Sequence, residues 1–293
     1  MSDARHDPAP ILDTILHPSD FSEASRVAFA HALKAALIAR ATLTLVHVAP
    51  EGEAAEWSEF PGVRETLERW AILPPGSTKS AVPKLGIDVK KYIAQDTDPV
   101  RSVVHYLEGH PTDLIVLATT QHEGWLGWMH KSVAATISRK AGQMTLFIPA
   151  GVDGFVSLDD GSVSLTNILI PVEDARRRMP AIAAAVRLVR RLSLPAGTFT
   201  LLHVGDDDQT GDVFRPDVPG WTWNTVVRDG DVTNGILETA GETQAGLIAM
   251  STAGRHGFLD ALRGSHSEQV LRRTKCPLLA IPEHSLAADS LRT

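Results

Sequence analysis

A run of small residues after one apolar segment has the composition of a phosphate-binding loop. Ser251 is followed after two residues by Gly254, and nine residues later come Gly264 and Ser265. Glycine allows the backbone dihedrals and the close approach that a bound anion requires. A helix that starts after Ser265 would add free N–H groups and the positive end of its dipole. The spacing therefore predicts that this loop holds the phosphates of a ligand.

The apolar segment before this loop belongs to a set of segments that occurs twice in the 293-residue chain. The matched pairs are 15–20 with 168–173, 43–48 with 199–204, 113–120 with 246–253, and 144–149 with 277–282. A chain of this length is expected to form about two domains, and the repeat indicates that they are alike. We predict a first domain at 1–150 and a second at 167–293. The interval 151–166, rich in Gly, Ser and Asp, is the predicted linker.

The matched segments are short and almost wholly apolar, and helical patterns separate them. Strands that are buried on both faces have this composition, so the alternation predicts parallel sheets built from βαβ units. Asp98-Pro99 is a predicted helix start, and Ser265 with Glu268 forms a predicted capping box. The first half has extra residues between its second and third strands, with a predicted helix at 63–72. The corresponding interval 206–221 is rich in Asp, Gly and Pro and is predicted to be a loop.

Composition narrows the class of protein and the range of partners. The net charge is −7, and no apolar run approaches the ~18 residues that cross a bilayer. The first residues lack the pattern of a signal peptide, and Cys276, the single cysteine, cannot form an intrachain disulfide. We therefore expect a cytoplasmic protein with neither nucleic acid nor a membrane as partner.

The loop and the strand motifs resemble those of the universal stress protein family. The loop is similar to the Gly-x2-Gly-x9-Gly-Ser/Thr signature of its ATP-binding members, and the motifs ILHP at 15–18 and LVHV at 45–48 resemble its first two strands. The resemblance implies two Rossmann-like domains of the adenine nucleotide alpha hydrolase-like type. Each would be a five-stranded parallel sheet with helices on both faces. The final strands, 144–149 and 277–282, would pair so that the halves form a pseudo-dimer, which also protects two apolar edges.

The same resemblance implies a nucleotide site in the second half. It places ribose and adenine against Glu173 and Val204, and the phosphates on the glycines, on Ser265 and on the main chain of His266. The predicted site comprises Pro171, Val172, Glu173, Val204, Ser251, Gly254, Arg255, Gly264, Ser265, His266 and Ser267. The implied ligand is ATP, with ADP and AMP as alternatives and Mg²⁺ alongside. No catalytic residue and no protein-bound metal are predicted. Ser251 replaces the usual first glycine, and Glu173 replaces the usual aspartate.

The first half is predicted to be a degenerate copy of this site. Its corresponding loop positions are Ala118, Gln121, Lys131 and Ser132, so every glycine is replaced. Asp20 keeps the family's carboxylate. Lys131 either reaches across the vacant pocket toward Asp20 or points into solvent.

Simpler interpretations remain open for most of these features. Glycines after a buried strand also serve connections, and Ser265 is explained as a helix cap without a ligand. His47 and His203 recur at equivalent strand ends, which favours shared packing. Three functions remain: a nucleotide-binding regulator of the stress response, a slow ATP hydrolase, or a ligand-free interaction module. For hydrolysis the acidic candidates are Glu173, Asp174 and Asp231, and the expected activity is at most weak. A homodimer is a further possibility.

Overall fold

The computed structural model describes residues 12–49, 60–96, 98–119, 143–172, 178–205, 214–252 and 266–282. The strands are β1 (Thr14–Pro18), β2 (Thr42–Ala49), β3 (Asp88–Gln95), β4 (Leu114–Thr119), β5 (Met144–Pro149), β6 (Asn167–Pro171), β7 (Gly197–Val204), β8 (Trp221–Arg228), β9 (Leu247–Thr252) and β10 (Leu278–Pro282). The helices are α1 (Glu23–Ala39), α2 (Val63–Arg69), α3 (Pro99–Gly109), α5 (Arg178–Arg191), α6 (Val232–Glu242) and α8 (His266–Arg273), with short 3-10 turns η1 (Lys79–Ala81) and η2 (Pro83–Leu85).

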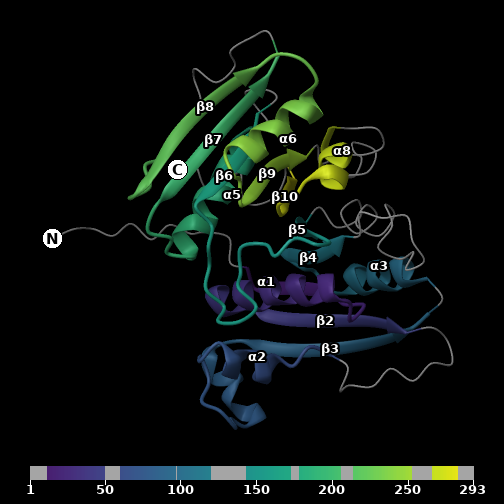
Figure 1. Cartoon of the computed structure of the whole chain (residues 1–293). Coiled ribbons are helices and arrows are strands. Elements are labelled where there is room, and N and C mark those ends of the chain that lie inside the picture. The colour runs from purple at the N-terminus through teal and green to yellow at the C-terminus, as the bar shows by residue number, and fades with distance from the viewer. Residues whose placement is uncertain are drawn as a thin grey trace.

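All of these strands join one sheet. Their order is β3-β2-β1-β4-β5-β10-β9-β6-β7-β8, so each half has the same order and the halves meet at their last strands (Figure 1). Pairing is parallel within each half and antiparallel between β5 and β10, where Phe147 lies opposite Leu278. The predicted fold class and the predicted pairing of the final strands are therefore confirmed. In each half the strand order reverses beside the first strand, between β1 and β4 and between β6 and β9.

Burial along the strands follows their place in the sheet. Every residue of β4, a central strand, is buried. The edge strand β3 instead alternates between exposed and half-buried residues, because one of its faces meets solvent. A buried central strand must be apolar on both faces, which is why the matched segments appear in the sequence as unbroken apolar runs.

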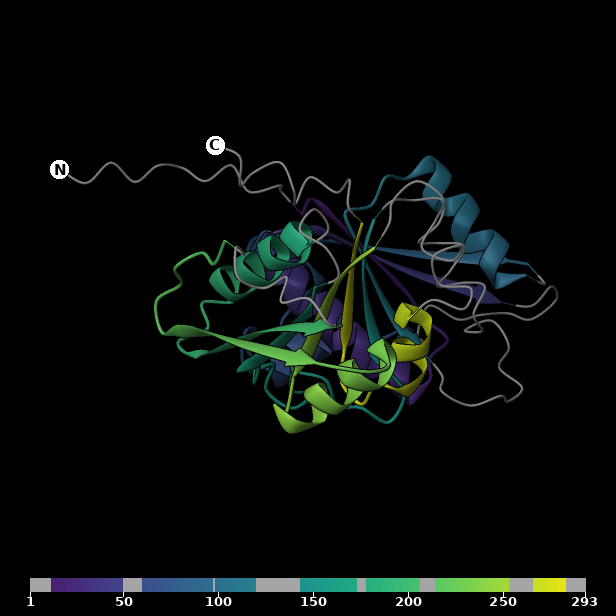
Figure 2. The same ribbon diagram turned by 90° about the horizontal axis from the view of Figure 1, so that it is seen from above.

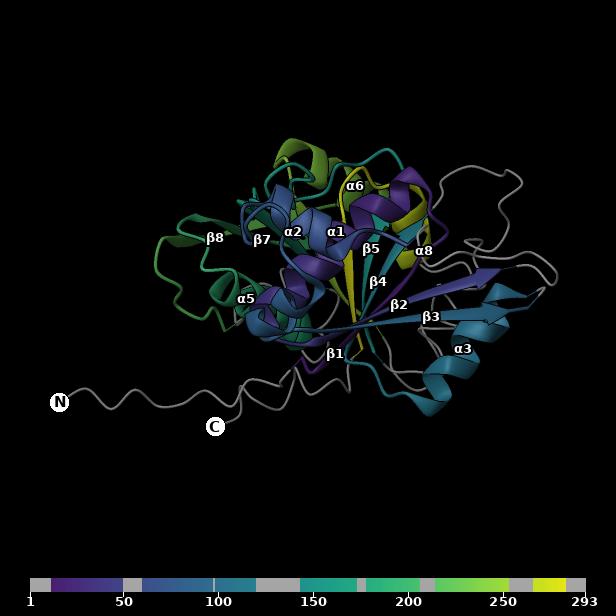
Figure 3. The same cartoon turned by 90° about the horizontal axis from the view of Figure 1, so that it is seen from below.

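Helices cover both faces of the sheet. Side chains of α1, α2 and α5 pack into one core, and those of α3, α6 and α8 pack into the other. Figure 2 shows α5 and α6 on opposite sides of the C-terminal strands, and Figure 3 shows α1 and α3 on opposite sides of β2 and β3. None of the helices in the described ranges is long and apolar enough to span a membrane.

Local signals in the sequence set several helix ends. The predicted helix at 63–72 is present as α2, and α3 begins at Pro99 with the Asp98 carboxylate accepting a hydrogen bond from the N–H of Arg101. The described part of the predicted loop before β8, residues 214–220, contains no helix. The predicted capping serine Ser265 lies outside the described residues.

Residues 151–166, predicted as a linker without regular structure, form an ordered loop that packs against the first half. Val156 and Val163 form an isolated antiparallel bridge. The backbone N–H groups of Phe155 and Val156 donate to Nε2 of His31 on α1. The indole N–H of Trp70 donates to the carbonyl of Leu158. The connection between the halves is thus fixed to the first half.

Candidate functional site

A cavity of about 130 Å³ opens at the carboxyl ends of the strands in the second half. It is lined by Pro171, Val172, Leu202, Val204, Val232, Ile236, Met250 and Ser251. These residues come from the ends of β6, β7 and β9, with α6 covering the site. The cavity therefore lies where the strand order reverses, which is where open parallel α/β sheets bind ligands.

Four of the predicted site residues meet in this cavity. Pro171 ends β6 and Val172 follows it, Val204 ends β7, and Ser251 lies near the end of β9, so three strands contribute. Parallel strands that end at one edge of a sheet bring such distant residues together.

The side chains of the other predicted site residues lie outside what the structure describes, so their part in the site stays a prediction. Glu173, Gly254, Arg255, Gly264 and Ser265 lie outside the described residues. His266 and Ser267 form the first turn of α8, where only the backbone is described.

The remaining lining residues are Leu202, Val232, Ile236 and Met250, and the sequence motifs did not single them out. Leu202 and Met250 each lie beside a motif residue on a strand, so the strand match could have found them. Val232 and Ile236 are four apart on α6, and this apolar spacing marks the face of the helix that contacts the sheet.

Close packing of α6 against β7 shapes one wall of the cavity. Gly235 lies within α6, and a Cβ atom built at this position would be 2.9 Å from Cγ2 of Val204. A larger residue at 235 would push the helix away from the strand and alter the wall. The glycine is needed here for close approach.

The hydroxyl of Ser251 has a structural partner. Its Oγ accepts a hydrogen bond of 3.2 Å from the backbone N–H of Ala181 in the first turns of α5. The N–H groups near a helix start lack partners within the helix, so a side-chain acceptor there stabilises the start. The serine that replaces a glycine of the family signature thus joins β9 to α5.

The two strand-end histidines hold equivalent backbone positions. Nδ1 of His47 donates to the carbonyl of Ser19 at 2.8 Å, and Nδ1 of His203 donates to the carbonyl of Val172 at 3.3 Å. Both carbonyls belong to the residue after the first strand of a half. The interpretation of the pair as shared packing is confirmed, and in the second half this contact helps to fix Val172 at the cavity.

The first-half counterpart of the site is arranged differently. One carboxylate oxygen of Asp20 accepts from the N–H of Ser22 at 3.0 Å and from its hydroxyl at 2.6 Å. Phe21, in the left-handed region at φ 62°, stacks on His47 with the ring centroids 4.0 Å apart. Lys131 lies outside the described residues, so its contact with Asp20 stays a prediction.

The described part of the cavity wall is largely apolar. Of the eight lining residues in the described ranges, none carries an ionisable side chain, and Ser251 supplies their one side-chain hydroxyl. Within the described ranges, no group of three His, Cys, Asp or Glu side chains is arranged to hold a metal ion. Apolar walls with few polar groups suit the flat face of a heteroaromatic ring.

Comparisons with known proteins agree with this fold. The sequence model of the universal stress protein family matches residues 12–149 and 213–282. A universal stress protein from Archaeoglobus fulgidus aligns with 92% of this chain and 96% of its own, at 18% identity and a TM-score of 0.60. A functionally unknown protein from Pseudomonas aeruginosa aligns with 96% of both chains, at 13% identity and a TM-score of 0.59. A shorter universal stress protein, solved in complex with cAMP, aligns with 48% of this chain and 99% of its own, at 18% identity and a TM-score of 0.33. No curated protein matches the sequence significantly.

Proposed function

Because the chain belongs to the universal stress protein family, we propose that it is a stress-response regulator. In this proposal its second half binds one adenine nucleotide, and ATP is the first candidate. The observation that carries the proposal is the meeting of Pro171, Val172, Val204 and Ser251 in one cavity. The resemblance of the sequence motifs to the family selects these four residues, and they come from three separate strands.

The cavity is proposed to hold the adenine, with the phosphates over the loop that contains Gly254 and Gly264. Val172, Val204 and Ile236 are apolar side chains that would contact the faces of the base. Helix α8 begins at His266, directly after the loop, so its free N–H groups would face the phosphates. Mg²⁺ would be held by the phosphates, since no cluster of metal ligands occurs in the described ranges.

A second and less well supported proposal is that the chain hydrolyses ATP slowly. Of the three acidic candidates, Glu173 and Asp174 lie outside the described residues. Asp231 caps α6, and its carboxylate accepts from the N–H of Asn234 at 2.8 Å. A carboxylate engaged in this way is a poor base for activating water. ADP release during a long incubation with ATP would reveal any turnover.

The first test is calorimetric titration of the full chain with ATP and Mg²⁺, and with ADP, AMP and cAMP. We expect one site per chain. Gly264→Lys, which copies Lys131 of the first half, should weaken binding about a hundredfold or more. The reason is that two lost charge-assisted hydrogen bonds cost roughly 1.5–3 kcal/mol each. Lys131→Gly should create no second site, because Ala118 and Gln121 still replace small loop residues.

A matched pair of variants tests the cavity itself. Val204→Phe would fill the space for the base, and Val48→Phe makes the same change at the equivalent position of β2. Only Val204→Phe should abolish binding, and melting temperatures without ligand control for folding. Two sites per wild-type chain, or unchanged affinity in both Gly264→Lys and Val204→Phe, would refute the assignment.

A further inference from the structure

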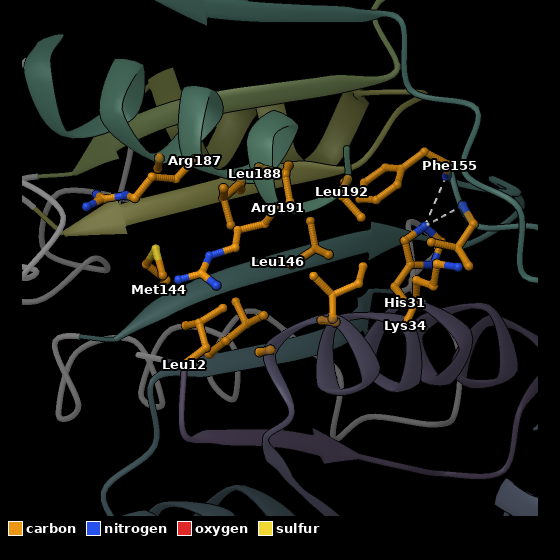
Figure 4. A pocket seen from close by; sticks show the side chains of 17 residues that line it. Leu12, His31, Lys34, Met144, Leu146, Phe155, Arg187, Leu188, Arg191 and Leu192 are labelled. Atoms are coloured by element: carbon orange, nitrogen blue, oxygen red, sulfur yellow. Dashed lines mark hydrogen bonds between the residues drawn. The ribbon is translucent and has the colours of Figure 1, made fainter. Parts of the chain in front are cut away.

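A second cavity, of about 250 Å³, lies between α1 and α5 (Figure 4). Its helices cover the opposite face of the sheet from α6, so this axial cavity is separate from the candidate nucleotide site. It is lined by Leu12, His31, Lys34, Ala35, Ile38, Ala39, Leu114, Met144, Leu146, Phe155, Val156, Ala184, Arg187, Leu188, Arg191, Leu192 and Leu279. Strands β5 and β10 form its floor.

The axial cavity lies on the pseudo-two-fold axis of the molecule. Five lining residues of α1 correspond to five lining residues of α5, at the offset that relates 15–20 to 168–173. The pairs are His31 with Ala184, Lys34 with Arg187, Ala35 with Leu188, Ile38 with Arg191, and Ala39 with Leu192. The symmetry is broken in charge at one pair, where Arg191 occupies the position equivalent to Ile38.

The walls of the axial cavity are mostly apolar, and the charged side chains among its described lining residues are cationic. Most of these 17 residues are aliphatic, and none of the 17 is acidic. Water in such a space gains little from its walls, so an apolar chain would displace it favourably. An anionic group at the rim would complement the cations.

Two of the three cationic lining residues lie toward different ends of the axial cavity. In Figure 4, Arg191 reaches from α5 toward Leu12 and Met144, whereas Lys34 lies beside His31 near Phe155. Neither Arg191 nor Lys34 forms an ion pair with another residue in the described parts of the chain. A guanidinium can bind a carboxylate with two parallel hydrogen bonds, which a lysine cannot do.

The linker residues form the end of the axial cavity near Lys34. Phe155 and Val156 are 5% and 2% exposed, and their N–H groups donate to Nε2 of His31. Nδ1 of the same ring donates to the carbonyl of Val27 at 2.8 Å. Both ring nitrogens of His31 are therefore used by the protein, and neither is available to a ligand at that end.

We propose that the axial cavity binds a medium-chain monocarboxylate, with its chain along the apolar walls and its carboxylate on Arg191. A water molecule occupies about 30 Å³ in the liquid, so 250 Å³ holds about eight groups of that size, and a methylene group is similar. Chains of about eight to ten carbons therefore fit. The proposal does not depend on nucleotide binding.

The experiment is calorimetric titration of the full chain with hexanoate, octanoate, decanoate and tetradecanoate, each below its micelle concentration. Affinity should rise about fourfold for each added methylene and stop rising once the cavity is full. One equivalent should bind per chain. Octanol, which lacks the charge, should bind about tenfold more weakly than octanoate, and octylamine should not bind measurably.

Matched variants locate the carboxylate. Arg191→Gln should weaken octanoate about tenfold and leave octanol unchanged, while Lys34→Gln should change octanoate affinity by less than about twofold. Ala35→Leu reduces the volume of the cavity, and leucine is still a good helix former. This variant should therefore prefer a carboxylate with a shorter chain than the wild type does. Gly264→Lys should have no effect on octanoate.

Four results would overturn the proposal. They are no saturable binding, more than one equivalent per chain, no dependence on chain length, or equal octanoate affinity in Arg191→Gln and the wild type. Loss of affinity in Lys34→Gln alone would refute the assigned orientation. Melting temperatures of each variant without ligand separate misfolding from loss of the site.

Discussion

His17 and His31 are buried, at 0% and 2% exposure, and their partners fix which nitrogen carries the proton. Nδ1 of His17 donates to the carbonyl of Val116 at 3.0 Å, and Nε2 accepts from the hydroxyl of Ser25 at 3.3 Å. The ring of His31 has the same arrangement between Val27 and the linker. Burial lowers the pKa of each ring from 6.5 to about 4, so both are neutral in the folded protein.

The stability of the protein should therefore fall as the pH drops from 6.5 toward 4. In this window the unfolded chain takes up protons at His17 and His31 that the folded chain does not, so the free energy of unfolding decreases. The loss should be roughly 2 kcal/mol per ring between pH 7.5 and 5. Urea unfolding at the two pH values measures it.

A control variant separates these rings from other titrating groups. His31→Gln keeps an acceptor for the linker N–H groups but cannot be protonated, so it should reduce the pH dependence by about half. If the variant and the wild type lose equal stability on acidification, His31 does not act in this way.

The residues of the candidate site that lie at strand ends were predictable from the sequence, because the strand pattern gives their positions. Val172, Val204 and Ser251 lie at or next to the ends of apolar runs that predict buried strands, and parallel strand ends meet at one edge of the sheet. Val232 and Ile236 were missed because their contribution depends on how α6 packs over the sheet. That packing depends on Gly235 and Val204, which are distant in the sequence.

Among the elements, the linker at 151–166 differs most from the structure that its composition predicts. Its order comes from contacts with helices that precede it by many residues: His31 on α1, and Arg69 and Trp70 at the end of α2. Strands and helices were predictable because their periodicity is local. The order of the linker was not, because its hydrogen bonds are to distant parts of the chain.

Two glycines of this linker make a matched test. Gly151 and Gly154 have φ of +74° and +71°. An alanine at either position would therefore strain the backbone by about 1–2 kcal/mol. A Cβ at Gly154 would lie on the His31 ring, whereas one at Gly151 would meet nothing within 4 Å. Gly154→Ala should therefore cost roughly 3 kcal/mol or more, since buried N–H groups also lose their acceptor. Chemical unfolding compares the two, and equal losses would show that the His31 contact adds no stability.

At the scale of the whole molecule, the halves share one sheet. Phe147 on β5 is fully buried and lies opposite Leu278 on β10, and both belong to a core with residues of both halves. The repeat and the apolar final strands made this junction predictable. The axial cavity was not predictable, because it depends on how the faces of α1 and α5 meet. The division at residues 150 and 167 remains our proposal.

A shared core predicts a single unfolding transition. Phe147→Ala should destabilise the chain by about 3–5 kcal/mol, and calorimetry should show one peak that moves to lower temperature as a whole. Val227→Ala, on the exposed surface of β8, should leave the peak almost unmoved. Two separate peaks in the wild type would show that the halves unfold independently.

The antiparallel junction of β5 and β10 also has a genetic consequence. Two identical subunits related by a two-fold axis share one gene, so a substitution on the axis appears twice and faces itself. Here the two copies lie in one reading frame and can mutate separately. Arg191 therefore stands in one copy at the position where the other copy has Ile38, and each copy can gain or lose a side chain by itself. Fusion lets selection act on each half alone while the sheet preserves their symmetric packing.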